Sequence, residues 1–183
     1  MLTAEKKKYT VDDYMMLEEG APFQLINYDL VMSPSPLALH QQVLFALSET
    51  IVLYNIEQGR KGQWMYSAMD VKFDDGNILQ PDILYITEER KSELIKERVE
   101  GAPDLIIEIL SPSNAYYDLR QKKDLYEKYG VKEYIIVDPI AQNADLYVLR
   151  NGIYERHQRA EKTEKLNSVL LPGLTFDLAK IFA

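Results

Sequence analysis

One stretch, Leu105 to Leu110, constrains the fold of this chain more than any other. It reads L-I-I-E-I-L, the most β-prone apolar run in the sequence, and Pro103 and Pro112 bound it. Polar residues do not alternate with apolar ones along this run, so neither face of the strand is expected to contact solvent. This pattern is typical of a central strand covered on both sides. Glu108 nevertheless stands in its middle, and an ionised carboxylate is costly to bury unless a cation, a metal or hydrogen-bond donors meet it. The rest of the chain must therefore supply partners for Glu108.

Composition excludes several classes of protein. With 183 residues, 46% of them apolar, we expect one domain spanning residues 1–183 with a full core. The absence of cysteine excludes disulfides and thiolate metal sites. No apolar run approaches the roughly 20 residues of a membrane span, and residues 1–10 lack the apolar core of a secretion signal, so we expect a cytoplasmic protein. The net charge of -8 argues against a general nucleic-acid coat protein, but not against an enzyme with a local basic track.

The hydrophobic pattern predicts helices on both sides of a mixed sheet. Expected helices cover residues 11–19, 37–55 and 114–130, and expected strands cover 23–26, 29–32, 64–73, 78–86, 105–110, 134–137, 145–150 and 153–156. Ser35 is the expected N-cap of the second helix. The first two strands predict an N-terminal hairpin, and Asn151-Gly152 predicts a C-terminal hairpin with a type I′ turn. The 64–73 and 78–86 strands are expected to pair with each other across a turn at residues 74–77. This order indicates an α/β or α+β domain with a mixed central β-sheet flanked by helices.

The helix after the central strand contains a lysine where an apolar residue is expected. On a helical wheel Lys122 falls at the centre of the apolar arc, with Asp118 one turn behind it. A short crossover helix packs this arc onto the strand it has just left, so Lys122 should point towards Glu108. Asp82 follows Pro81 and opens the Ile83 to Ile86 run, which places a second carboxylate at the mouth of a neighbouring strand.

Two interpretations of these charges remain open from the residues alone. Lys122 with Glu108 or Asp118 can form a buried structural ion pair without any chemistry. Alternatively, the carboxylates of Asp82 and Glu108 can hold a hard divalent cation while the lysine presents an ammonium group to a charged substrate. His40 lies on the apolar arc of its helix and faces the core, where it either holds a water or phosphate or is a hydrogen-bonded core histidine.

Several motifs, in a fixed order, resemble a known family. They are M-S-P-S-P-x-x-x-H at 32–40, Q-P-D-I at 80–83, P-D-L-I-I-E-I-L-S-P-S at 103–113, D-x-x-x-K-x-x-x-Y-x-x-x-G-V-x-E-Y at 118–134, V-D-P at 137–139 and L-P-G-L at 171–174. This pattern resembles the Uma-two family of restriction-endonuclease-like proteins, which belongs to the PD-(D/E)XK nuclease superfamily. The resemblance covers most of the chain and implies a restriction-endonuclease-like fold.

The resemblance also implies a set of site residues. Asp82 and Glu108 would be the metal-binding acids, helped by the backbone carbonyl of Ile109, and the ion would be Mg²⁺ or Mn²⁺. In the superfamily a lysine usually follows the second acid by two residues, but Leu110 occupies that position here. In the family the lysine comes from the following helix, and Lys122 is the corresponding residue here. This assignment agrees with the position of Lys122 on the helical wheel.

Three further residues would be accessory to this site. His40 and Asp118 match the family motifs, and Asp118 could orient the lysine. Many relatives have glutamate in the N-terminal hairpin where this chain has Gln24, which can hydrogen-bond but lacks the charge.

These implications add up to a metal-dependent DNA endonuclease that hydrolyses phosphodiester bonds with a metal-activated water. Candidate DNA contacts are Arg60, Lys61, the 91–98 segment, Arg120 and Lys123, and the acidic net charge predicts weak, salt-sensitive binding. We also expect a homodimer formed across a tyrosine-rich hairpin surface, and no small-molecule cofactor. The alternative is a catalytically silent relative that binds nucleic acid or acts in assembly. Sugar hydrolysis is disfavoured because Trp64 is the only tryptophan and Glu108 lies in an apolar context.

Overall fold

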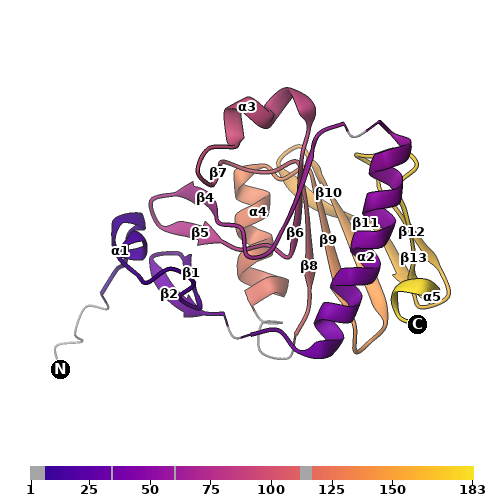
Figure 1. Ribbon diagram of the computed structural model, residues 1–183, viewed down its shortest axis with the longest axis horizontal. Helices are drawn as coiled ribbons and strands as arrows, with labels where there is room; N and C mark the ends of the chain where they lie inside the picture. Colours follow the sequence, from indigo (N-terminus) through magenta and orange to yellow (C-terminus); the bar gives the residue numbers. More distant parts are fainter. Residues whose placement is uncertain (1–6, 34, 60, 112–116) are drawn as a thin grey trace.

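The computed structural model describes residues 7–33, 35–59, 61–111 and 117–183, without the side chains of residues 117–119. A six-stranded sheet runs through the middle of the molecule in the order β11-β10-β9-β8-β6-β3 (Figure 1). Its strands are β3 (Gln63–Tyr66), β6 (Ile83–Ile86), β8 (Leu105–Ile109), β9 (Glu133–Asp138), β10 (Asn143–Arg150) and β11 (Ile153–Glu161). The pair β8–β9 is parallel and the other pairs are antiparallel, so the sheet is mixed, as predicted.

β8 is the interior strand that the sequence predicted. All five of its residues are buried, and it lies between β6 and β9. Helix α2 (Ala38–Glu57) packs Leu47 and Ile51 onto the face of the sheet that contains Ile107. Helix α4 (Lys123–Tyr129) covers the opposite face, where its Leu125 lies in one core with Ile106 of β8 (Figure 1). A polar side chain in β8 therefore faces one of these two helices and not the solvent.

A second, five-stranded sheet stands beside the first in the order β2-β1-β5-β4-β7. Its strands are β1 (Phe23–Ile26), β2 (Asp29–Met32), β4 (Val71–Asp74), β5 (Asn77–Leu79) and β7 (Val99–Glu100). β1 and β2 form the predicted N-terminal hairpin. The 3-10 helix η1 (Glu88–Arg90) and helix α3 (Lys91–Leu94) precede β7.

The prediction that residues 64–73 and 78–86 form one hairpin is wrong. β3 pairs with β6 in the large sheet, whereas β4 pairs with β5 in the small one. The chain changes sheets at residues 67–70 and again at 80–82. Pro81 has no N–H for a continuous ladder, which explains the second break. The crossing segments are held together where the Ser67 N–H donates to the Asp82 carbonyl oxygen at 2.9 Å.

Two helix boundaries also differ from the prediction. Helix α1 (Val11–Met15) begins with a capping box of Thr10 and Asp13 but ends earlier than residue 19. Helix α2 begins after Leu37, whose backbone is extended, and no side chain caps it. Ser35 is therefore not the N-cap.

The predicted 114–130 helix has two parts. Residues 112–116 lie outside the described part of the chain. Tyr117–Lys122 form a π-helical segment, η2, that continues directly into α4. π-Helical turns are rare and occur frequently at functional sites. α4 ends at Gly130, which has φ +85° and a left-handed backbone, as the sequence predicted.

The C-terminal third closes the molecule. β10 and β11 form the predicted hairpin, turning at Asn151 and Gly152 with positive φ angles. β12 (Lys165–Asn167), β13 (Thr175–Asp177) and α5 (Leu178–Ile181) follow and return to the α2 side of the large sheet (Figure 1). In the part of the chain that the structure describes, no helix has the length and apolarity needed to cross a bilayer.

The tyrosines of the C-terminal hairpin face the body of the protein. Tyr154 is buried and Tyr147 half-buried, and both rings pack near Tyr134 at centroid distances of 6.0 Å and 6.3 Å. The two rings therefore contribute to the core between this hairpin and β9.

Candidate functional site

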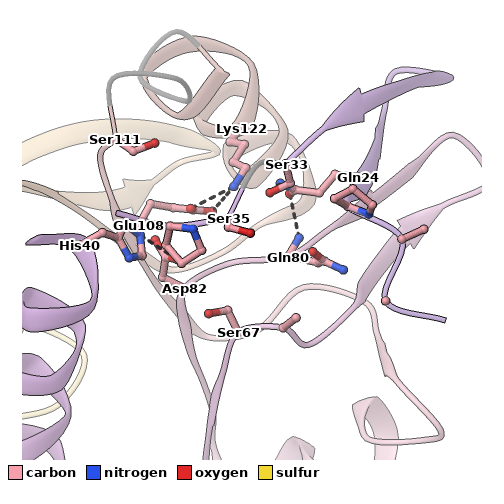
Figure 2. A pocket seen from close by; sticks show the side chains of 15 residues that line it. Gln24, Ser33, Ser35, His40, Ser67, Gln80, Asp82, Glu108, Ser111 and Lys122 are labelled. Atoms are coloured by element: carbon pink, nitrogen blue, oxygen red, sulfur yellow. Dashed lines mark hydrogen bonds and ion pairs between the residues drawn. The ribbon is translucent and has the colours of Figure 1, made fainter. Parts of the chain in front are cut away.

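A cavity of about 270 Å³ lies where β8 ends and β6 begins. Its walls come from both sheets, from α2 and from the last residue of η2, as Figure 2 shows. Four titratable side chains line it: His40, Asp82, Glu108 and Lys122. The remaining polar walls are hydroxyls and amides, from Gln24, Ser33, Ser35, Ser67, Gln80 and Ser111. The carboxyl end of a buried strand is a frequent place for ligand sites in sheets that helices cover.

Glu108 points to the α4 side of β8 because side chains alternate along a strand and Ile106 also faces that side. Its side chain is almost completely buried. The ammonium nitrogen of Lys122 lies 2.9 Å from Oε1 and 2.9 Å from Oε2 of this carboxylate (Figure 2). The prediction from the helical wheel that Lys122 points towards Glu108 is therefore confirmed. The buried ammonium group and the buried carboxylate neutralise each other's charge.

Tyr126 is a second donor to Glu108, which we did not predict from the sequence. Its hydroxyl donates to Oε1 of Glu108 at 2.6 Å, and the residue is completely buried. Tyr126 follows Lys122 by four residues, so both side chains lie on one face of the helix. This spacing was the available signal, since a helix face that brings Lys122 to Glu108 also brings Tyr126 there.

Asp82 directly precedes β6, and its carboxylate is held from two sides. Its Oδ2 accepts a 2.7 Å hydrogen bond from the backbone N–H of Ile109, and its Oδ1 lies 3.2 Å from Nε2 of His40. His40 comes from the first turn of α2 and is buried, as the wheel predicted. Its Nδ1 is buried and has no hydrogen-bond partner among the described residues.

Pro81 affects the same region through the backbone. Ile83 pairs with Ile107 across β6 and β8, and continuing this register places Pro81 opposite Ile109. A proline has no N–H, so it cannot donate to the carbonyl of Ile109 as a regular strand residue would. The sequence Q-P-D therefore removes one ladder hydrogen bond beside Asp82.

The two remaining accessory residues differ in what the structure describes. Gln24 is buried on the cavity wall; its Oε1 accepts from the Gln80 N–H at 2.9 Å and its Nε2 donates to the Ser33 hydroxyl at 3.2 Å. Both ends of the amide thus tie the N-terminal hairpin to its neighbours. Asp118 belongs to η2, but its side chain lies outside the described part of the chain.

Those predicted DNA contacts that belong to the described residues do not line this cavity. Lys91 pairs with Glu88 and the Lys96 ammonium donates to the Ser92 carbonyl, so this part of the 91–98 segment is engaged within the protein. Lys123 lies over the ring of Tyr147, 3.8 Å from its centroid. Arg60 lies outside the described residues. Among the described walls of the cavity, Lys122 is the only lysine or arginine.

The donors around the cavity suit a hard divalent cation. Among the residues that the structure describes, no group of three or more His, Cys, Asp or Glu is arranged to hold a metal. Asp82 and Glu108 nevertheless offer carboxylate oxygens, and Ile109 offers a carbonyl. Mg²⁺ typically binds one or two carboxylates and takes its other ligands from water and substrate. The chemistry of the donor set therefore fits an ion of this class.

Comparisons with known proteins identify both the fold and the family. A relative from Synechocystis sp., an uncharacterised protein, is 27% identical over 153 residues, which is 80% of this chain and 84% of the relative. The crystal structure of "a putative nuclease belonging to DUF820" from Anabaena variabilis matches with a TM-score of 0.73 at 20% identity, covering 94% of this chain and 97% of that one. The fold is therefore that of this nuclease-like structure. The Uma2 family model, "Putative restriction endonuclease", matches residues 11–179, and the chain thus belongs to the Uma2 family.

Proposed function

We propose that this protein is a divalent-metal-dependent endonuclease that hydrolyses phosphodiester bonds in DNA. Membership of the Uma2 family supports a nuclease. The observation that carries the finer proposal is the convergence of Asp82, Glu108 and Lys122 on one cavity. Asp82 directly precedes β6, Glu108 belongs to β8 and Lys122 to η2, so three separate segments of the chain bring these side chains together.

Asp82, Glu108 and the carbonyl of Ile109 would hold Mg²⁺ or Mn²⁺. Such an ion neutralises a phosphodiester oxygen and lowers the pKa of a bound water. Pro81 supports this assignment because it leaves the Ile109 carbonyl without a ladder donor from that position.

The protein's own side chains have separate tasks in this proposal. Lys122 would offset the negative charge that develops on the phosphorus oxygens during water attack, from a site already shielded from bulk solvent. His40, 3.2 Å from Asp82, would keep that carboxylate turned towards the cavity. Asp118, one turn before Lys122, would orient the lysine.

We further propose that DNA binding is weak and salt-sensitive, because the net charge is -8 and duplex affinity depends on neutralised phosphates. A homodimer would present the basic side chains of two copies to one duplex and thereby increase the affinity. Light scattering during gel filtration, together with binding measured over a salt series, tests both statements. A monomer whose DNA affinity does not change with salt would contradict them.

The central experiment is a cleavage assay. Purified protein is incubated with plasmid and with single-stranded DNA in Mg²⁺, in Mn²⁺ and in EDTA. Wild type is compared with Asp82→Asn, Glu108→Gln and the matched surface control Lys128→Met. We expect metal-dependent cleavage that both carboxylate variants lose and the control retains.

The same assay separates the alternative. A catalytically silent relative would show equal background cleavage in all four proteins. That outcome would leave Lys122–Glu108 as a structural ion pair and the fold as a binding or assembly module.

A further inference from the structure

The bond from Tyr126 to Glu108 is the starting point. The hydroxyl donates to Oε1 at 2.6 Å, and both residues are buried. A hydrogen bond from a neutral O–H to a carboxylate is charge-assisted, and so is stronger and more directional than one between neutral groups. Glu108 is thus held by a directional bond from Tyr126 in addition to the ion pair with Lys122.

The two donors constrain Glu108 differently. Lys122 lies 2.9 Å from each oxygen, and its ammonium is a compact charge on a flexible stem that can follow a turning carboxylate. The tyrosine ring has only two side-chain torsions and is packed against Tyr134 and Phe73, at centroid distances of 5.2 Å and 5.8 Å. Its hydroxyl therefore holds Oε1 at a fixed point and defines the orientation of the carboxylate.

Tyr126 itself is not part of the cavity wall that the described residues form, whereas Glu108 and Lys122 are. A substrate in the cavity would meet the carboxylate and the ammonium but not the phenol. Within the described residues, the hydrogen bond to Glu108 links Tyr126 to the cavity wall.

We propose that Tyr126 is a positioning residue, which fixes the Glu108 carboxylate in the orientation that allows Glu108 and Asp82 to bind one divalent cation. The proposal rests on the proposed endonuclease function. It predicts that removing a single oxygen atom from Tyr126 weakens cation binding even when no DNA is present.

The test compares Tyr126→Phe with Tyr154→Phe. Tyr154 is a matched control because it is also buried and its hydroxyl donates to a backbone carbonyl, that of Val131, at 2.8 Å. Mn²⁺ binding is measured by calorimetry without DNA, and kcat and KM for DNA are measured separately. We expect Tyr126→Phe to bind Mn²⁺ about tenfold more weakly and to lower kcat at saturating Mn²⁺ with little change in KM, whereas Tyr154→Phe binds Mn²⁺ like wild type.

Equal Mn²⁺ affinity in wild type and Tyr126→Phe would overturn the proposal, and so would equal weakening in both variants, which indicates general loosening. A wild type that binds Mn²⁺ and cleaves DNA, beside an unaffected Tyr126→Phe, would leave the endonuclease intact and remove only the role of Tyr126. A wild type that neither binds Mn²⁺ nor cleaves DNA would overturn both.

A second measurement does not depend on the folding of Tyr126→Phe. Mn²⁺ is titrated into the wild-type protein and into Glu108→Gln while the ultraviolet difference spectrum of tyrosine is recorded. A phenol bonded to the ion-binding carboxylate should change its absorption in wild type, and this change should be absent in Glu108→Gln. A wild-type spectrum that stays flat while Mn²⁺ binds would contradict the proposal.

Discussion

Glu108 and Glu133 are two buried glutamates in neighbouring strands of one sheet, with opposite surroundings. Both are nearly inaccessible to solvent. Glu133 pairs with Leu105 across β8 and β9, so it lies at the start of the parallel pair, whereas Glu108 lies near its end. The carboxylate of Glu133 accepts bonds from the Ser168 hydroxyl and from the N–H groups of residues 169 and 170. Glu108 instead meets a buried ammonium and lines a cavity.

The difference shows that burial alone does not distinguish a structural acid from a candidate functional one. Glu133 ties a C-terminal loop to the sheet, because its carboxylate accepts from one hydroxyl and two backbone N–H groups of that loop. Glu108 is held by side chains of one helix and adjoins a space that a ligand can enter. The nature of the donors and the presence of a cavity separate the two acids.

The largest expected effect follows from removing the ammonium beside Glu108. Lys122→Met leaves a buried carboxylate without its cation, which should lower the free energy of unfolding by about 3–5 kcal/mol. DNA cleavage should fall by about a thousandfold, as expected when a charge that stabilises a transition state is lost. Urea unfolding and the plasmid assay measure the two effects. Retention of cleavage would make Glu108 as purely structural as Glu133.

Removing Glu133 should affect stability without affecting cleavage. Glu133→Ala leaves the donors of Ser168, Val169 and Leu170 without their acceptor. We expect the free energy of unfolding, measured with urea, to fall by about 2–5 kcal/mol. The cleavage rate per folded molecule should match wild type. A specific loss of cleavage would break the contrast between the two glutamates.

Asp104 provides a third, purely structural buried acid with a predictable pH dependence. Burial raises the pKa of its carboxyl, but hydrogen bonds from Lys132, the Thr87 N–H and Arg90 outweigh this, so its pKa in the folded protein lies below the ordinary value of 3.8. A lowered folded-state pKa stabilises the protein above pH 3.8, and this stabilisation disappears as the pH falls through the folded-state value. Asp104→Asn should therefore lower the free energy of unfolding by about 1.5–3 kcal/mol near pH 7. Its free energy of unfolding should also fall less steeply than that of wild type as the pH is lowered. Unfolding curves from pH 7 to pH 2 measure this, and parallel curves for wild type and variant would refute it.

The smallest effect is expected at Lys128, on the exposed side of α4. Its ammonium donates to the Tyr129 hydroxyl at 2.9 Å, but more than half of the side chain is open to solvent. Exposed charges of this kind contribute little to stability. Lys128→Met should leave cleavage and the melting temperature close to wild type, and a loss of cleavage comparable to that of Lys122→Met would show that the burial of Lys122 is not what sets it apart.

Short-range patterns predicted much of this architecture. The buried β8, both terminal hairpins and the end of α4 at Gly130 follow from apolar periodicity and turn chemistry. The contact between Lys122 and Glu108 was also predictable, because a helix returning over its own strand leaves few orientations for its apolar face.

Other features depend on long-range packing that periodicity does not encode. The separation of β3–β6 from β4–β5 arises because residues 67–70 and 80–82 cross between sheets. Pro81 marks the second crossing in the sequence, but no comparable signal marks the first. The bond from Tyr126 to Glu108 was missed for another reason. Packing of the ring usually accounts for a tyrosine on the apolar arc of a helix. The acceptor of its hydroxyl can be identified only when the position of that acceptor in the fold is known.

The amide of Gln24 has a consequence for how the shape of the cavity is coupled to the rest of the fold. It ties β1, which contributes Gln24 to the cavity wall, to Gln80, two residues before Asp82. β1 also pairs with β2 and β5, and its Leu25 and Ile26 are buried, so this wall is part of the packed small sheet. A change in the hairpin that moved β1 would therefore be transmitted to the segment that carries Asp82, so the width of the cavity and the position of its carboxylate are coupled.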